Sequence, residues 1–125
     1  MTTPTLAEAR ALLAAALTAV EGVTEVTATG FRSQLRAGYG WTRVAAVRPA
    51  SFRTSVVDLE AIVVLGQDEL TAEAQLDALA VPLLDAATNI LELPAAGVTV
   101  EPVVMSTGPT SSLFVLVVSL STEVS

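Results

Sequence analysis

Two carboxylates, Asp58 and Glu60, lie two residues apart in a Val-rich segment that is typical of a strand. Alternate residues of a strand point to the same side, so the two side chains share one face. Such a pair can act as general acid and base, or supply half of the oxygen ligands of a hard cation. No third ligand lies nearby in the sequence, so the pattern favours the other interpretation, a solvated strand face.

A second group of residues is basic and aromatic. Five of the six basic residues fall in a stretch without any acidic residue: Arg32, Arg36, Arg43, Arg48 and Arg53. Residues 26–57 carry +5, whereas the rest of the chain carries −12. The same stretch holds the only Tyr and the only Trp, Tyr39 and Trp41. Because Arg, Tyr and Trp are enriched at interface hot spots, we predict that these seven residues contact a partner.

Two other interpretations of the arginines remain open. Arginines beside aromatic residues can contact phosphates and stack on nucleic-acid bases. The net charge of −7 and the pI near 4.3 oppose this, although salt screens charges beyond about 8–10 Å. The segment can also be a solvated arm without a partner. The sequence favours docking onto protein over both.

No catalytic signature accompanies these groups. The chain has no Cys and no His, so it lacks a thiolate and the commonest general base and metal ligand. Hydroxyl residues cluster near a Gly-Pro pair, at Ser106, Thr107, Thr110, Ser111 and Ser112. They are not part of a nucleophile elbow or of a phosphate-binding glycine pattern, so the sequence indicates turn residues. We therefore predict no enzyme, no metal and no cofactor.

Length and composition indicate one domain over residues 1–125. Hydrophobic residues make up 52% and charged residues only 15% of the chain, so we expect some surface to be buried in an oligomer. The longest apolar runs, 11–17 and 113–118, are too short for a membrane span. The first twenty residues lack the basic start of a signal peptide.

The first half of the chain predicts a helix, a strand and an arm. Thr5 and Glu8 form a capping box before a helix over 6–20, with Gly22 as its C-cap. A strand follows over 23–29. We expect 23–48 to form a long hairpin or arm that turns near Gly38 and Gly40, with 30–48 ordered only on docking.

The second half predicts a strand, a helix and a two-strand ribbon. Strand 52–65 precedes a helix over 71–91, which Pro82 should kink or split. Strands 98–105 and 113–122 follow, joined by a turn over 106–112, and the second should be central because both of its faces are apolar. The order α-β-β-β-α-β-β predicts an α+β fold with two helices on one face of a mainly antiparallel sheet.

This layout resembles the tail terminator proteins of long-tailed bacteriophages. The resemblance rests on the opening Ala/Leu helix, the Arg/Gly/Trp hairpin, the Val-rich strand with Asp58 and Glu60, the second Ala/Leu helix and the closing ribbon of 97–101 with 113–120. It implies a hexameric ring that caps the finished tail tube and meets the neck of the filled head. The implied partners are further copies of the chain, the tail tube protein and the head–tail connector, with DNA only in transit and no membrane. The implied location is the virion, and the host cytoplasm during assembly.

The charge pattern suits a ring, because a head-to-tail ring needs two different, complementary surfaces on each subunit. A basic arm and an acidic body are such surfaces, and an acidic lumen would let DNA pass. Three alternatives stay open. The chain can be another phage neck or tail-tube subunit, a ligand-binding α+β domain with an apolar pocket, or a small enzyme that uses Asp58, Glu60 and an arginine.

Overall fold

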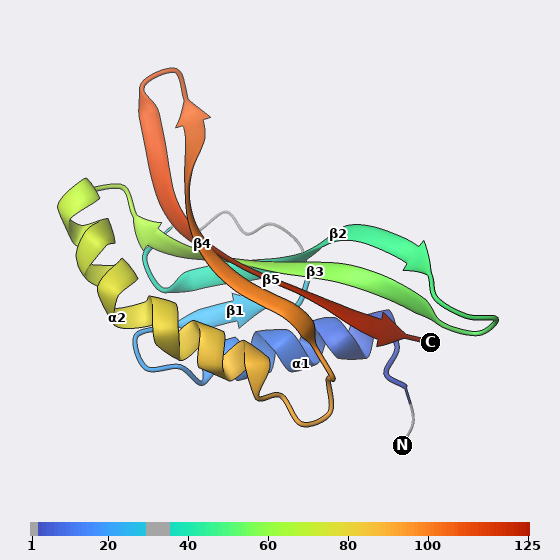
Figure 1. Cartoon of the computed structure of the whole chain (residues 1–125). Helices are drawn as coiled ribbons and strands as arrows, with labels where there is room; N and C mark the ends of the chain where they lie inside the picture. Colours follow the sequence, from blue (N-terminus) through green and yellow to red (C-terminus); the bar gives the residue numbers. More distant parts are fainter. Residues whose placement is uncertain (1–2, 30–35) are drawn as a thin grey trace.

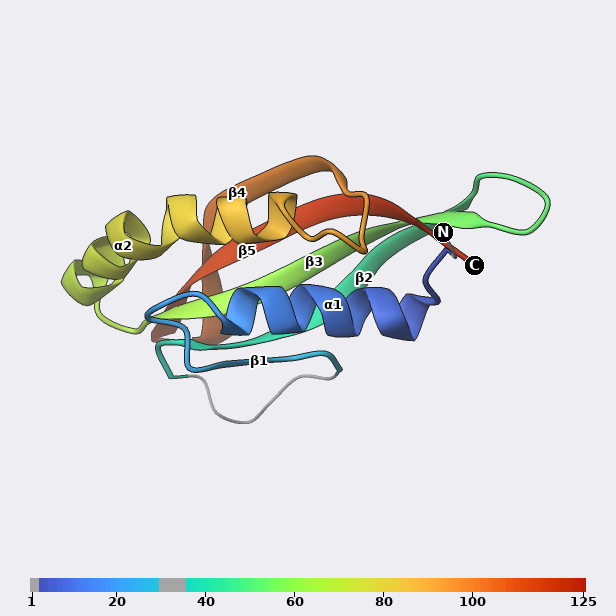
Figure 2. The same cartoon turned by 90° about the horizontal axis from the view of Figure 1, so that it is seen from below.

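A computed structural model describes residues 3–29 and 36–125 of the chain. Two helices and five strands follow one another in the expected order: α1 (Leu6–Thr18), β1 (Glu25–Thr27), β2 (Tyr39–Pro49), β3 (Ser55–Gly66), α2 (Glu69–Thr88), β4 (Ala96–Gly108) and β5 (Ser111–Val124). Both helices lie on the same side of the sheet (Figures 1 and 2). The predicted α+β fold, with two helices on one face of a mainly antiparallel sheet, is confirmed.

The sheet has the strand order β1-β2-β3-β5-β4. Three neighbouring pairs are antiparallel, and β1 pairs with β2 in parallel. The expected position of β5 is confirmed, because it lies between β3 and β4. Its neighbours bury Leu113, Val115, Leu116 and Val118, two on each face of the strand.

The hairpin expected over 23–48 is wrong. Val26 of β1 pairs with Gly40 of β2 in a parallel ladder, and two parallel neighbours cannot be joined by a tight turn. The two strands are joined by the segment between Thr27 and Tyr39, of which residues 30–35 lie outside the described residues. The long antiparallel hairpin is formed one element later, by β2 and β3 around residues 50–54.

Helix ends follow local side-chain chemistry. The Thr5 hydroxyl accepts the backbone N–H of Glu8, and the Glu8 carboxylate accepts that of Thr5, both at 3.2 Å, so the capping box is confirmed. The helix ends at Thr18 with Ala19 as C-cap, two residues earlier than expected. Gly22 lies beyond the cap, in a turn with φ of +96°, a backbone conformation that favours glycine.

The second helix starts and ends slightly earlier than expected. Asp68 caps it by accepting the backbone N–H of Thr71 at 3.0 Å. Pro82 does not split the helix, which runs on to Thr88. Pro82 has no N–H to donate to the Ala78 carbonyl. Both residues are exposed, so water can bind that carbonyl instead.

The core has two parts, because β3 carries apolar side chains on both faces. Val57, Leu59, Ala61, Val63 and Leu65 face the helices and are all buried. On the far face, which is the sheet face opposite the helices, the buried apolar side chains lie at one end only. There a smaller cluster comprises Trp41, Ile62, Val64, Leu113 and Val115.

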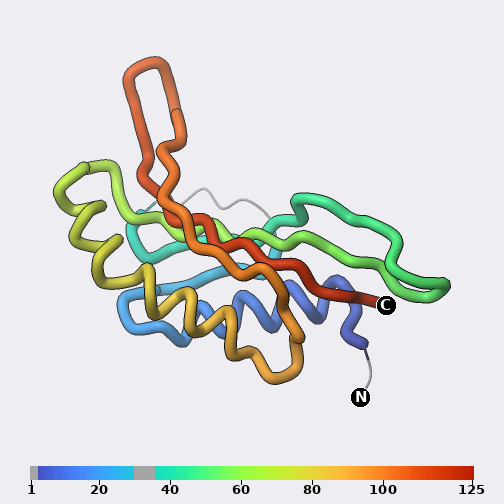
Figure 3. The backbone as a smooth tube through the Cα atoms, viewed as in Figure 1, coloured from blue at the N-terminus to red at the C-terminus, as the bar shows by residue number. Residues whose placement is uncertain are grey.

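Two hairpins extend beyond this sheet. The turn between β4 and β5 is shorter than the predicted 106–112, because Gly108 still pairs with Ser111. The β4–β5 hairpin points away from the helices, and the β2–β3 hairpin extends sideways at one end of the molecule (Figures 1 and 3). The chain termini meet near that same end, where the Ser125 N–H donates to the Pro4 carbonyl at 2.9 Å.

The contact of Gly40 with β3 yields a stability prediction. A Cβ at position 40 would stand 2.4 Å from the Ile62 carbonyl oxygen, so Gly40→Ala must push two paired strands apart. We expect a loss of about 1–3 kcal/mol in the free energy of unfolding, measured by urea denaturation.

Gly108→Ala is the matched control, because its Cβ would find its nearest atoms at 3.8 Å. It should leave stability unchanged or raise it slightly. Equal effects of the two substitutions would contradict the close approach at Gly40.

Candidate partner interface

The seven residues predicted to contact a partner do not form one patch. Tyr39, Trp41, Arg43 and Arg48 lie along β2, from its first residue to its next-to-last. Arg36 precedes the strand, and Arg53 lies in the turn that follows it. Arg32 falls outside the described residues. The stretch therefore has three parts: an aromatic end at Tyr39 and Trp41, a middle at Arg43 and Arg48, and a hairpin tip at Arg53.

A β-bulge decides which way the arginines point. Arg43 pairs directly with Glu60, but the register shifts between Val44 and Ala46, so that Ala46 lies opposite Asp58. Without the extra residue, Arg48 would lie on the face opposite Arg43. The bulge brings both arginines onto the far face, beside the two carboxylates.

Each carboxylate is paired with one of these arginines. The Arg43 Nε donates to Glu60 Oε1 at 2.6 Å. The Arg48 guanidinium donates through both terminal nitrogens to Asp58, with Nη2 to Oδ1 at 3.0 Å. The Ser121 hydroxyl on β5 also donates to Asp58 Oδ1, at 2.6 Å. Two of the arginines predicted to contact a partner therefore bind carboxylates of their own chain.

The pairing fixes the charge of Asp58. Hydrogen bonds from Arg48 and then from Ser121 lower the pKa of Asp58, and the same Asp58 bond raises the pKa of Arg48. A carboxyl with a lowered pKa is a poor proton donor at neutral pH. The arrangement thus acts as a polar clamp across β2, β3 and β5 and does not favour acid–base chemistry.

The aromatic end is part of the fold. Trp41 is only 5% exposed, and it packs with the far-face cluster. The guanidinium carbon of Arg36 lies 5.6 Å from the centre of the Tyr39 ring. Residues 40–48, which belong to the segment expected to gain order only on docking, pair with β3 of the same chain. Trp41 has little area left to bury against a partner.

The hairpin tip is the exposed part of the stretch. Phe52 is 96% exposed, and the Arg53 guanidinium lies over its ring at 6.0 Å. Val47, on the strand that leads to the tip, is also exposed. Sequence reasoning missed Phe52, because it placed residue 52 inside a strand. Pro49 and Ser51 just before it are turn residues, and that signal could have identified an aromatic side chain in a turn.

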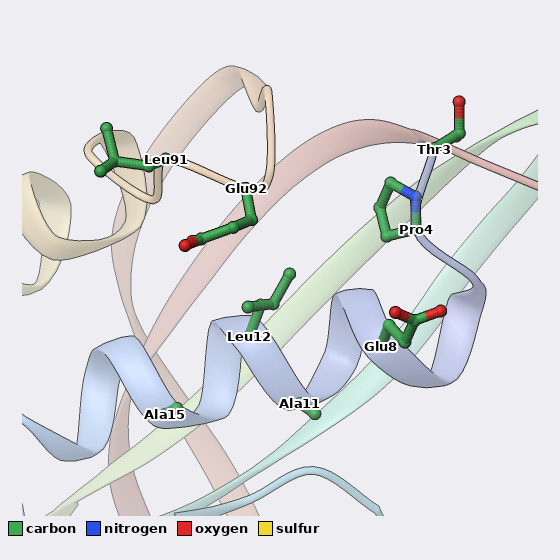
Figure 4. Close-up of a pocket in the computed structure, with 8 residues that line it drawn as sticks. All are labelled: Thr3, Pro4, Glu8, Ala11, Leu12, Ala15, Leu91 and Glu92. Carbon is green, nitrogen blue, oxygen red and sulfur yellow. The ribbon is translucent and has the colours of Figure 1, made fainter. Parts of the chain in front are cut away.

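A hollow of about 690 Å³ lies on the outer side of the helices, between α1 and the segment after α2. Leu12, Ala11 and Ala15 line it from α1, and Leu91 and Glu92 from the other side (Figure 4). Its remaining lining comes from Thr3, Pro4 and Glu8. The Glu8 carboxylate is engaged by the Thr5 N–H, so the hollow offers mainly apolar contact.

Within residues 3–29 and 36–125, no three acidic, His or Cys side chains come together in a way that could hold a metal ion. None of the helices in the same ranges is long and apolar enough to cross a membrane.

No family model, curated protein or solved structure matches this chain.

The clamp at Asp58 predicts a pH-dependent stability. The pKa of Asp58 is lowered in the folded state, so its stabilising effect is present above the ordinary value of 3.8 and is lost as the pH falls through the lowered value. Asp58→Asn should lower the Tm at pH 7, and the difference from the unmodified chain should shrink below about pH 4.

Asp77→Asn is the matched control, because Asp77 is exposed on α2 and makes no ion pair among the described residues. It should change the Tm little at either pH. A Tm difference for Asp58→Asn that is the same at pH 3 and pH 7 would contradict the clamp.

Proposed function

We propose that this chain is a structural subunit of a phage virion. In this proposal its copies form a hexameric ring that caps the tail tube of a long-tailed phage and joins it to the head or neck. The ring contacts the tail tube protein on one side and the head–tail connector on the other, and DNA crosses its lumen. The role is architectural, with no catalytic step.

The exposure of Phe52 at the β2–β3 tip is the observation that carries this proposal. A ladder of eleven and twelve residues holds Phe52 beyond the sheet, where it is 96% exposed. An isolated domain gains nothing by holding a large aromatic ring in water, whereas an aromatic side chain beside Arg53 suits an interface anchor. The tip also carries Arg53, a positive charge on a chain whose net charge is −7.

A ring needs a second, different surface on each subunit. The start of α2 supports this requirement, because Asp68, Glu69 and Glu73 gather there beside Leu70, which is 77% exposed. This acidic, partly apolar end lies at the other end of the molecule from the tip (Figures 1 and 2). A basic end and an acidic end suit head-to-tail contact between copies.

The arrangement of the carboxylates supports a role without catalysis. Asp58 and Glu60 are each bound to an arginine, and the part of the chain that the structure describes has no histidine or cysteine to act beside them. Their geometry suits strengthening of the sheet at the base of the hairpin.

A ligand-binding domain is the second candidate, and the apolar hollow beside α1 favours it. A small apolar ligand bound there would raise the Tm of the isolated monomer. Leu12→Trp would fill the hollow and remove that effect without touching the hairpin tip.

The ring proposal predicts assembly on tail tubes. Chains mixed with purified tail tubes should appear in electron micrographs as a ring at one tube end. Mass measurement should give a species of about six times the 12.8 kDa of one chain. The protein should also be present in purified virions.

A chain that stays monomeric beside tail tubes and is missing from virions would overturn the proposal. A ring found inside the neck, or repeated along the tube, would instead favour another neck or tail-tube subunit.

A further inference from the structure

Large apolar side chains that face water are concentrated at two ends of the molecule. Among the described residues seven are strongly exposed, and five of these lie at the two ends. Phe52 lies at the β2–β3 tip and Val47 on the strand that leads to it. Leu70, Val103 and Val104 lie around the start of α2 and the base of the β4–β5 hairpin. Figures 1 and 3 show these regions at opposite ends of the molecule.

The second region contains a groove of about 270 Å³. It lies between the first turns of α2 and the β4–β5 hairpin. The apolar residues that line it are Leu65, Ala72, Leu76, Pro102, Val103, Val104, Phe114 and Val115. Such a volume and lining suit one aromatic side chain.

The rim of this groove is acidic. Glu69 and Glu73 line it from α2, four residues apart and hence on one side of the helix. No hydrogen bond or ion pair joins either carboxylate to another side chain within the described part of the chain. At the other end, Arg53 next to Phe52 is likewise outside the described ion pairs.

We propose that Phe52 of one copy inserts into this groove of the next copy, with Arg53 facing Glu69 and Glu73. The occupant is a second copy of this chain, because an apolar ring beside a positive charge matches an apolar groove with a negative rim. The contact joins opposite ends of the molecule, so it repeats from copy to copy and can close into a ring. This inference rests on the proposed ring and names its interface.

The larger hollow beside α1 is a weaker receptor. It offers more volume than one phenyl ring fills, and one of its two carboxylates, Glu8, already accepts the Thr5 N–H. The groove at α2 offers two carboxylates free of such contacts within the described residues.

Cysteine cross-linking tests the contact, because the chain contains no cysteine of its own. Phe52→Cys and Val104→Cys variants, each with one thiol, are mixed at high protein concentration and oxidised, with and without tail tubes. The proposed contact predicts a disulfide-linked dimer in the mixture. A Phe52→Cys and Leu91→Cys mixture is the control, since Leu91 is 87% exposed but lies beside the other hollow.

Assembly measured by mass gives a second readout that needs no cross-link. Phe52→Ala should raise the concentration needed for half-assembly by at least about tenfold, as expected for loss of an interface anchor. Leu91→Ala should leave that concentration unchanged. Arg53→Glu should weaken assembly, and adding Glu73→Arg should restore part of it.

The outcomes separate the interface from the ring. A ring that forms without the 52–104 cross-link, and with Phe52→Ala as active as the original chain, overturns this inference and leaves the proposed function standing. Cross-linked open chains that never cap a tube support the interface and count against the tail role. Monomers under every condition overturn both.

Discussion

The structure depends on the pairing of β3 with β2 on one side and β5 on the other. Along β3, one face is apolar from Val57 to Leu65 and takes the two helices. The other face changes from charged at Asp58 and Glu60 to apolar at Ile62 and Val64. This one strand therefore sets the position of the main core, the far-face cluster and the ion-paired base of the hairpin.

The same pairing gives the arginines two roles, binding within the chain or facing solvent. Arg43 and Arg48 bind carboxylates on β3, and Arg10, the only basic residue outside the arginine-rich stretch, donates from α1 to Thr42 on β2 at 3.1 and 3.0 Å. These contacts hold β2 from both faces. Arg53 lies beyond the last paired residues, where its charge is available to another molecule. The position of an arginine relative to the β2–β3 ladder therefore decides whether it stabilises the fold or faces outward.

Local chemistry made much of the fold predictable from the sequence. The Thr5–Glu8 capping box, the alternation along β3 and the two apolar faces of β5 depend on residues close in the chain, and each was correct. The parallel pairing of β1 was missed, because the local sequence of a short strand followed by glycines is compatible with either a tight turn or a longer crossover. The bulge after Val44 was equally hidden, since one extra residue leaves the strand composition unchanged. Of the seven residues predicted to contact a partner, Trp41 is buried by the far-face cluster, and the exposed Phe52 was not among the seven.

The ladder that carries the tip also links its reach to its orientation. Each residue added to both β2 and β3 would move the turn outward by about 3.3 Å and reverse the face on which the tip residues project. Related chains that keep the same side of the tip toward a neighbour can therefore change its length only in steps of about 6.6 Å. A single added residue in one strand would instead act like the existing bulge and redirect everything beyond it. In the proposed ring, the diameter and the spacing of subunits would therefore vary in discrete steps that are set by the pleat of the β2–β3 hairpin.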